Sequence, residues 1–335
     1  MRVALFSALP HDRAFFTEAN PAYGHDLGFY DTALNEESVA LAFGIRAVCA
    51  FVHDRLNADV LAMLASGGTE LVALRCTGFN NVDLHAAQVH GITVMRVPAY
   101  SPHAVAEHAA ALMLALNRKV HRAYNRLREG NFALEGLLGF EMAGKSVGIV
   151  GAGAIGAVTA RIMAGFGCRV LAHDPAPSPA VEALGVRYVG LDVLLEEADI
   201  ISLHCPLTPS THHLIGTKAL ERMKPGAMLI NTSRWAVVDT RAIIGALKSG
   251  RLGALGLDVY EEEGDLFFRD LSGQVLQDDV FSRLLTFPNV LITGHQGFYT
   301  REALEAIAHT TLVNISAFER GETSGNEVTT ALLAD

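Results

Sequence analysis

The sequence has few cysteines and no long apolar run, and each absence excludes a class of protein. The four cysteines are Cys49, Cys76, Cys168 and Cys205. They form no Cys-x-x-Cys pair and stand mostly in apolar runs, which favours reduced core thiols over disulfides or a zinc site. No apolar run approaches the ~18 residues of a membrane span, and the N-terminal apolar stretch is too short for a signal peptide. We therefore expect a soluble, cytoplasmic protein without a metal site.

Basic residues are also scarce relative to acidic ones. The chain has 26 Lys and Arg against 36 Asp and Glu, which gives a formal net charge of −10. A general affinity for nucleic acid or anionic membranes requires concentrated Lys and Arg, so we expect neither as a partner. Any anionic ligand must be held by a local site. With 335 residues, of which 50% are hydrophobic, the chain is long enough for about two domains, each with its own core.

A glycine-rich stretch near the middle of the chain predicts a dinucleotide site. Residues 151–156 read Gly-Ala-Gly-Ala-Ile-Gly and follow the apolar run Val-Gly-Ile-Val. In such a strand-turn-helix unit, Gly151 permits the tight turn and Gly153 lets the backbone approach the phosphates. Gly156 lets the helix pack against the strand. The N–H groups at the helix N-terminus would then bind the pyrophosphate.

Asp174 strengthens this interpretation. It ends a second strand-like run and stands 18 residues after Gly156, about where a carboxylate that binds the ribose hydroxyls is expected. Such a carboxylate would repel a 2′-phosphate, so the sequence predicts NAD rather than NADP. An ordinary tight turn is the alternative, but strand, glycines, helix and acid together argue against it.

Strand-like and helical runs alternate along the whole chain. Before the glycine-rich stretch, short β-rich runs lie at residues 3–6, 47–52, 71–75 and 93–97. After it they lie at residues 169–173, 199–204, 227–231, 254–258 and 290–293. This alternation is typical of α/β proteins with parallel sheets. Because the fingerprint arrives only at residue 151, we expect the first unit to be a separate domain.

Two long helices are predicted from apolar residues at spacings of three and four. The first follows Pro98 and Pro102 and is expected to run to about Glu129. Its apolar stripe packs either on its own domain or on a second subunit, and the sequence leaves both open. The second spans residues 302–320 and is expected to return to the first domain. Residues 261–288 interrupt the alternation and are expected to form a surface excursion.

The second unit offers the groups that reduction of a carbonyl by a nicotinamide needs: a cation, an acid and a group that tunes the acid. Arg234 follows a strand and has the fork geometry for a carboxylate, although a surface arginine is the alternative. His295 is the candidate acid, or else a satisfied core histidine. A carboxylate beside it, Asp258 or Glu263, would fix the tautomer and raise the pKa of the imidazole. Glu263 alone also reads as a solvated acid.

These residues, in their order and spacing, resemble the D-isomer-specific 2-hydroxyacid dehydrogenase family along essentially the whole chain. The motifs that carry the resemblance are Gly-Ala-Gly-Ala-Ile-Gly at 151–156, Ser-Leu-His-Cys-Pro-Leu-Thr at 202–208, Asn-Thr-Ser-Arg at 231–234, Leu-Asp-Val-Tyr-Glu-Glu-Glu at 257–263 and Thr-Gly-His-Gln at 293–296. Residues 74–84, 98–102, 105–108 and 265–270 most resemble the fermentative D-lactate dehydrogenases of bacteria.

The resemblance implies an α/β fold of two doubly wound parallel-sheet domains with an active-site cleft between them. Residues 1–99 plus 299–335 would form a discontinuous, flavodoxin-like substrate and catalytic domain, and residues 100–298 a Rossmann NAD-binding domain. Hinges are implied near residues 99–102 and 294–298. The long helix after Pro102 would be a dimer-forming arm, in a homodimer or homotetramer.

The resemblance also assigns roles to residues. It implies that His295 is the acid/base, Glu263 its partner, Arg234 the substrate-binding cation and Asp258 a supporting acid. The implied substrate-binding residues are Thr77, Gly78, Phe79, Tyr100, Arg234, His295 and Phe298. The implied cofactor-binding residues are Val105, Gly151, Gly153, Ala154, Ile155, Gly156, Asp174, His204, Cys205, Pro206, Thr211, Thr232, Ser233, Arg234, Asp258 and His295.

These assignments predict an NAD-dependent reduction of pyruvate to D-lactate by NADH. Another small 2-keto acid as substrate and a non-catalytic NADH-sensing protein are the alternatives. One residue departs from the family pattern, which has glycine directly after the catalytic arginine, because this chain has Trp235, its only tryptophan. We expect the indole either to crowd the nicotinamide or to point out of the cleft.

Overall fold

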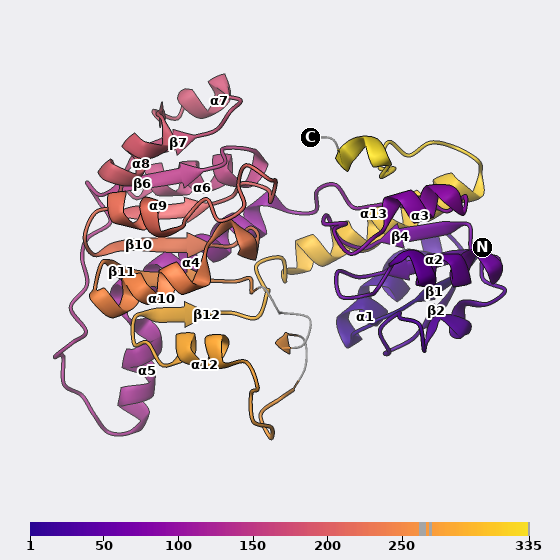
Figure 1. Cartoon of the computed structure of the whole chain (residues 1–335), viewed down its shortest axis with the longest axis horizontal. Helices are drawn as coiled ribbons and strands as arrows, with labels where there is room; N and C mark the ends of the chain where they lie inside the picture. The colour runs from indigo at the N-terminus through magenta and orange to yellow at the C-terminus, as the bar shows by residue number, and fades with distance from the viewer. Residues whose placement is uncertain (261–265, 268–269, 334–335) are drawn as a thin grey trace. The chain divides into compact units, whose positions relative to one another are not determined.

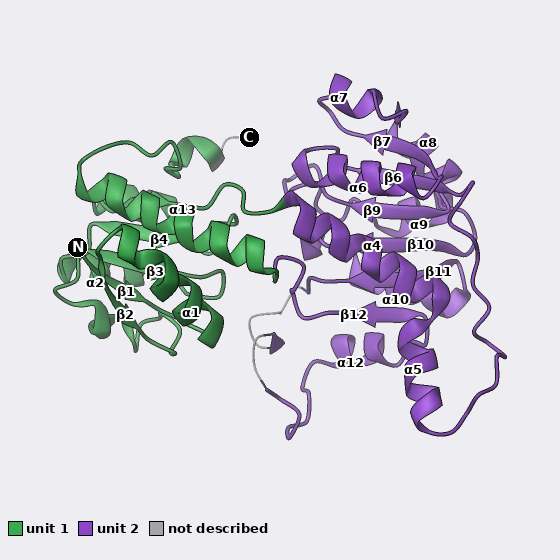
Figure 2. Cartoon of the chain, turned by 180° about the vertical axis from the view of Figure 1, so that it is seen from behind, with its two compact units in different colours: residues 1–101, 299–335 green, residues 102–298 purple. Residues whose placement is uncertain are grey.

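The computed structural model describes residues 1–260, 266–267 and 270–333. It divides into two compact units, of which unit 1 comprises Met1–Ser101 and Tyr299–Asp335 and unit 2 comprises Pro102–Phe298 (Figure 2). Each unit contains one parallel sheet with helices packed against it, so the predicted α/β class with two parallel-sheet domains is confirmed (Figure 1).

The sheet of unit 1 has five parallel strands in the order β2-β1-β3-β4-β5, the doubly wound order of flavodoxin-like folds. The strands are β1 (Arg2–Leu5), β2 (Asp26–Phe29), β3 (Ala47–Ala50), β4 (Leu71–Leu74) and β5 (Thr93–Met95). The two central strands β3 and β4 are buried along their whole length, which is why they read as continuous apolar runs.

Helices cover the sheet of unit 1. They are α1 (Pro10–Ala19), α2 (Ala58–Ser66), α3 (Leu84–Val89) and α13 (Arg301–Glu319), with short 3₁₀ turns at Asn20–Ala22, Val39–Ala42 and Thr330–Leu333. Side-chain caps set three helix starts, because Asn57, Asp83 and Thr300 each accept a hydrogen bond from a first-turn backbone N–H. The C-terminal helix α13 packs against α1 and β4.

The sheet of unit 2 has seven parallel strands in the order β12-β11-β10-β9-β6-β7-β8. The strands are β6 (Ser146–Val150), β7 (Arg169–His173), β8 (Arg187–Tyr188), β9 (Ile200–Leu203), β10 (Ala227–Asn231), β11 (Leu252–Leu257) and β12 (Val290–Ile292). The chain order reverses between β6 and β9, which are neighbours in the sheet. Ligands of doubly wound sheets bind at such a switch point, beyond the carboxyl ends of the strands.

The helices of unit 2 are α4 (Pro102–Arg118), α5 (Val120–Arg128), α6 (Ala154–Gly165), α7 (Pro179–Glu182), α8 (Leu191–Glu197), α9 (Thr217–Arg222), α10 (Thr240–Ser249) and α12 (Asp279–Leu285), with a 3₁₀ turn at Trp235–Val237. The apolar stripe of α4 packs mainly against α6 and also contacts β10 and β11. Among the described residues, no helix is long and apolar enough to cross a membrane.

The long helix predicted to run to Glu129 is wrong in one respect, because it breaks at Lys119. That residue has φ 52° and ψ 37°, in the left-handed region, so α4 ends before it and α5 begins after it. Val120, the first residue of α5, is 57% exposed, although the predicted helix would place it on the apolar stripe. The break turns α5 away from the sheet (Figure 1). The predicted surface excursion at 261–288 lies partly outside the described residues, and its described part contains α12.

Candidate active site

The glycine-rich turn joins β6, which ends at Val150, to α6, which begins at Ala154. Gly151 has φ 88°, and a Cβ there would lie 2.5 Å from the backbone nitrogen of Cys205. A Cβ on Gly156 would lie 2.0 Å from the carbonyl oxygen of Gly151. Both clashes are with backbone atoms, so only glycine fits at these two positions.

Gly153 differs from its two neighbours in the motif. It caps the N-terminus of α6 without a side-chain hydrogen bond, and a Cβ there would meet nothing within 4 Å. No packing within the protein therefore requires glycine at this position. The predicted reason for glycine here, close approach of a cofactor phosphate to the first-turn N–H groups of α6, stays a prediction.

Asp174 lies directly beside this turn. Its Oδ2 accepts a hydrogen bond of 2.7 Å from the backbone N–H of Ala152, and its Oδ1 accepts one of 2.8 Å from Ala176. The N–H of Gly151 donates to the carbonyl oxygen of His173, the last residue of β7. Asp174, which the spacing suggested, and the glycine-rich turn therefore form one local structure.

Two polar atoms near the switch point are buried without a hydrogen-bond partner among the described residues. They are Nδ1 of His204, after β9, and Oγ1 of Thr232, after the neighbouring strand β10. Buried polar atoms are rarely left unpaired, so each is suited to a ligand with its own donors and acceptors, as a nicotinamide nucleotide has. Both atoms fit the predicted NAD site.

His204 is a neutral side chain in the working pH range. Burial lowers the pKa of its imidazole to about 4. Its Nε2 lies 2.9 Å from Oγ of Ser202 in β9. Its neighbour Cys205 is buried, and burial raises the pKa of that thiol to about 11, so the thiol is unreactive near neutral pH.

Arg234 follows β10 and is positioned by the backbone around it. Asn231, the buried last residue of the strand, donates from Nδ2 to the carbonyl oxygen of Arg234 at 2.9 Å. The Oδ1 of Asn231 accepts hydrogen bonds from the N–H and the hydroxyl of Ser233. Asn231 thus fixes the tight turn that presents a partly exposed guanidinium after the strand.

Asp258 holds the loop that carries His295. Its Oδ1 accepts hydrogen bonds from Oγ1 of Thr293 at 2.5 Å and from the N–H of Gln296 at 2.9 Å. Its Oδ2 accepts one from the N–H of Gly297 at 2.7 Å. The carboxylate therefore bonds to residues on both sides of His295, which has a left-handed φ of 51°. Asp258 fixes the backbone from which the imidazole projects.

Asp258 is 2% exposed and remains ionised because it has partners. Burial alone would raise its pKa, but hydrogen bonds from His108 and Thr293 and the charge of His108 hold the pKa of this carboxyl below its ordinary value. The Nε2 of His108, on α4, lies 3.2 Å from Oδ1 of Asp258. Sequence analysis assigned no role to His108, and its position among the alanines of α4 was the one signal for a polar role.

Glu263, predicted to pair with His295, lies outside the described residues, so that pairing stays a prediction. Trp235 is 6% exposed and belongs to the apolar core of unit 2, where its ring packs edge-on against Tyr260 with centroids 5.0 Å apart. The indole is therefore a core side chain. The ring of Phe298 packs edge-on against that of His295, with centroids 6.4 Å apart.

The predicted substrate residues fall in both units. Thr77, Gly78, Phe79 and Tyr100 lie in unit 1, whereas Arg234, His295 and Phe298 lie in unit 2. In unit 1, Arg96 donates from its guanidinium to the carbonyl oxygen of Thr77 at 3.2 Å and stacks over the ring of Phe79. The Sγ of Cys76 donates to the carbonyl oxygen of Gly78. These contacts fix the short turn after β4.

A buried ion pair anchors the start of that turn, and sequence analysis missed it. Arg75 is 1% exposed, and its Nε donates to Oδ1 of Asp12 at 3.1 Å. A second guanidinium nitrogen donates to the carbonyl oxygen of Ser7, and the ring of Phe51 lies 4.8 Å from the guanidinium carbon. A buried arginine in an otherwise apolar strand end was the available signal.

Residues 110–297, more than half of the chain, match the family model described as D-isomer specific 2-hydroxyacid dehydrogenase, NAD binding domain. The chain belongs to the D-isomer-specific 2-hydroxyacid dehydrogenase family. The predicted family, the class of NAD-dependent oxidoreductase and the NAD cofactor are thereby confirmed.

Individual members of this 2-hydroxyacid dehydrogenase family match the chain over almost its full length. It is 52% identical over 328 residues to D-lactate dehydrogenase of Escherichia coli, covering 98% of this chain and 100% of that one. The apo structure of that enzyme superposes with a TM-score of 0.91 at 50% identity, covering 98% of this chain and 100% of the other.

Two further structures show how far the likeness extends. A pyruvate reductase of Chlamydomonas reinhardtii matches with a TM-score of 0.93 at 47% identity, covering 97% and 98% of the two chains. A D-lactate dehydrogenase with NAD+ from Lactobacillus jensenii matches with a TM-score of 0.83 at 33% identity, covering 98% of this chain and 100% of the other.

Proposed function

We propose that this protein is an NAD-dependent D-lactate dehydrogenase that reduces pyruvate to D-lactate with NADH, reversibly. The observation that carries the proposal is the loop at His295, which the buried carboxylate of Asp258 fixes from both sides. Relatives named D-lactate dehydrogenase or pyruvate reductase, each at least 47% identical, support pyruvate as the substrate.

In the proposed reaction, His295 donates a proton to the carbonyl oxygen of pyruvate, and Arg234 binds the pyruvate carboxylate with its planar fork. The bound cofactor supplies the hydride to the keto carbon. Glu263 is proposed to hold the imidazole in its protonated form. Asp258 acts on His295 through the backbone of its loop.

The turn after β4 is proposed to complete the substrate site from unit 1. We propose that backbone N–H groups near Gly78 and Phe79 donate hydrogen bonds to the pyruvate carboxylate and that Tyr100 and Phe298 limit the size of the substrate side chain. This assigns residues 1–99 and 299–335 to substrate binding and residues 100–298 to NAD binding. For the cofactor, we propose the remaining predicted contacts at Val105, Ala154, Ile155, Pro206 and Thr211.

Residues of α5 and the chain after it are proposed to pair with a second copy of the chain. Tyr124 is 61% exposed, Phe132 72% and Leu138 88%, which is unusual for large apolar side chains so close in sequence. A dimer or tetramer would cover them, and sedimentation of the purified chain tests this. A cytoplasmic location stays a prediction, which cell fractionation tests.

A spectrophotometric assay of NADH oxidation with pyruvate, followed by chiral analysis of the product, tests the activity. We expect D-lactate, and we expect pyruvate to be the best of a panel of 2-keto acids with larger side chains. His295→Ala should lower kcat by at least ~10²-fold with little change in NADH affinity. Arg234→Lys should mainly raise KM for pyruvate.

His103→Ala is the matched control, because its side chain on α4 is 63% exposed and belongs to neither predicted site. Its kinetics should equal those of the wild type. L-lactate as product, or near-normal kcat/KM in both site variants, would refute the proposal. NADH binding without turnover of any 2-keto acid would favour a sensing protein.

A further inference from the structure

Unit 2 contains a pocket of about 290 Å³ at the amino ends of its strands. Lys145 precedes β6, Asp199 precedes β9, and Gly253 lies near the start of β11. Because all strands of this sheet are parallel, the glycine-rich turn lies at the opposite edge. The pocket is therefore separate from the nucleotide site and from the loop of His295.

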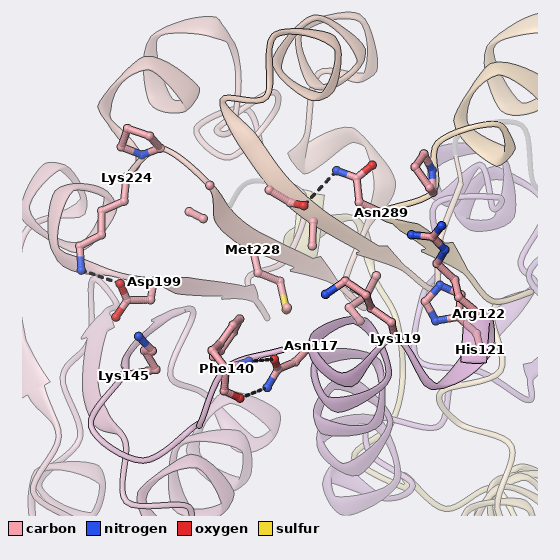
Figure 3. A pocket seen from close by; sticks show the side chains of 17 residues that line it. Asn117, Lys119, His121, Arg122, Phe140, Lys145, Asp199, Lys224, Met228 and Asn289 are labelled. Carbon is pink, nitrogen blue, oxygen red and sulfur yellow. Dashed lines mark hydrogen bonds and ion pairs between the residues drawn. The ribbon is translucent and has the colours of Figure 1, made fainter. Parts of the chain in front are cut away.

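Cations dominate the lining of this pocket. Figure 3 shows Lys224 and Asp199 at one side, Lys145 below them, and Lys119 with Arg122 at the other side. Asp199, the one carboxylate in the lining, is fully engaged, because Lys224 lies 2.8 Å from Oδ1 and the N–H of Ser146 donates to Oδ2.

The charge of Lys145 also helps to lower the pKa of Asp199, and Nζ of Lys119 donates to the carbonyl oxygen of Leu138. Lys119, Arg122 and Lys145 together still leave the lining with an excess of positive charge. All three are only partly exposed. In a chain with a formal charge of −10, such a local excess of positive charge favours the binding of an anion. Lys145 lies over the ring of Phe140, 5.5 Å from its centroid, which holds its ammonium at the pocket wall.

Two further features of the lining, the backbone of Lys119 and a buried nitrogen of His121, also favour a ligand in this pocket. The left-handed Lys119 that breaks the long helix is one of the lining residues, and such backbone strain in a bulky residue is typical of functional sites. The Nδ1 of His121, also in the lining, is buried without a hydrogen-bond partner among the described residues. Burial is the main cause that lowers the pKa of His121, and the charges of Arg122 and Lys119 lower it further, against a backbone hydrogen bond at Ala115 that raises it.

We propose that this pocket binds a small metabolite that carries two phosphate groups, with Arg122 and Lys119 at one end and Lys145 at the other. The guanidinium fork matches a phosphate in bidentate fashion, and the lysines act as point charges on either side. The volume is at the lower limit of small-molecule sites, which suits a compact phosphorylated metabolite rather than a second dinucleotide.

Calorimetry with inorganic pyrophosphate tests the site. The chain is first saturated with NADH, so that the glycine-rich turn is occupied, and ionic strength is held constant with sodium chloride. We expect one pyrophosphate per chain and at least tenfold weaker binding of inorganic phosphate. Lys145→Gln and Arg122→Gln should each weaken pyrophosphate binding roughly tenfold, the loss of about one charge-assisted hydrogen bond.

Lys218→Gln is the matched control, because this exposed lysine on α9 does not line the pocket, and its pyrophosphate affinity should equal that of the wild type. Melting temperatures identify any variant that fails to fold. If one pocket variant fails to fold, the pyrophosphate affinity of the other still tests the site. The absence of pyrophosphate binding at constant ionic strength would overturn the proposal. This holds also if a second copy of the chain closes the pocket. Equal affinity in wild type and both pocket variants would overturn it as well.

Discussion

The Nε2 of His108 lies 3.2 Å from Oδ1 of Asp258 and 2.9 Å from Oγ1 of Thr293, so one imidazole joins α4 to the loop that carries the proposed acid, His295. Asp258 has no freedom to move without breaking contacts on both sides of that loop. The orientation of His295 therefore depends on a side chain of α4, which is distant in sequence but adjacent in space, and this dependence can be measured.

Replacement of His108 by alanine should lower kcat roughly tenfold while the dissociation constant for NADH stays nearly unchanged. The reason is that Asp258 loses one hydrogen bond and the loop of His295 loosens. His108→Gln can still donate to Asp258 and should recover most of the rate. A merely structural role for His108 would lower the melting temperature of both variants without altering kcat or its pH dependence.

The low pKa of Asp258 makes stability depend on pH in a defined direction. Its pKa in the folded chain is below the ordinary carboxyl value. The ionised group therefore stabilises the fold at pH values above the ordinary carboxyl pKa. This stabilisation is lost as pH falls through the folded-state pKa. Urea unfolding of wild type and Asp258→Asn should differ most near pH 7 and least in acid. A difference that stays constant as pH falls from the ordinary carboxyl pKa through the lower folded-state pKa would contradict this assignment.

Local patterns predicted most of the strands, the glycine-rich turn and the acid beside it, because each depends on residues close in sequence. The edge strands β2 and β8 were not predicted. Asp174 lies on the turn as its spacing suggested, with Ala152 as its hydrogen-bond donor. The break at Lys119 could not be predicted, because lysine gives no signal for a left-handed backbone. The pairing of His108 with Asp258 depends on how α4 packs on the sheet, which no short pattern encodes.

The glycines of the turn should separate packing from ligand contact. Gly151→Ala places a Cβ 2.5 Å from a backbone nitrogen at φ 88°, so it should lower the melting temperature of the chain without ligand. Gly153→Ala meets nothing within 4 Å and should leave that temperature unchanged, yet weaken NADH binding because the phosphates approach there. Equal NADH affinity in Gly153→Ala and wild type would place the phosphates elsewhere.

Asp174→Ala should narrow the preference for NADH over NADPH. We expect the wild-type carboxylate to accept hydrogen bonds from the ribose hydroxyls and to repel a 2′-phosphate, so its removal should relieve that repulsion. Asp174→Asn separates charge from shape, because its amide oxygen can still accept from the N–H of Ala152. The ratio of kcat/KM for the two cofactors is the measurement. Equal efficiency of both cofactors in the wild type would count against the predicted role.

Trp235 stands where the family usually has glycine after the catalytic arginine, and substitutions at this position test what the indole contributes. The indole is 6% exposed and packs against Tyr260 in the core, so it fills space that glycine would leave empty. Trp235→Gly should therefore destabilise unit 2 by about 3 to 5 kcal/mol, the usual cost of deleting a large buried aromatic side chain. Trp235→Phe should cost less, and neither should raise kcat/KM for pyruvate.

The fluorescence of this single indole supplies a second measurement on the same residue. Because Trp235 adjoins Arg234 in sequence, NADH bound at the proposed site should quench its emission by energy transfer, whereas NAD should quench it much less. Urea unfolding followed through this emission reports unit 2, in whose core the ring lies. If Trp235→Gly raised kcat/KM for pyruvate and left the melting temperature unchanged, the indole would instead crowd the nicotinamide, and its core packing would contribute little to stability.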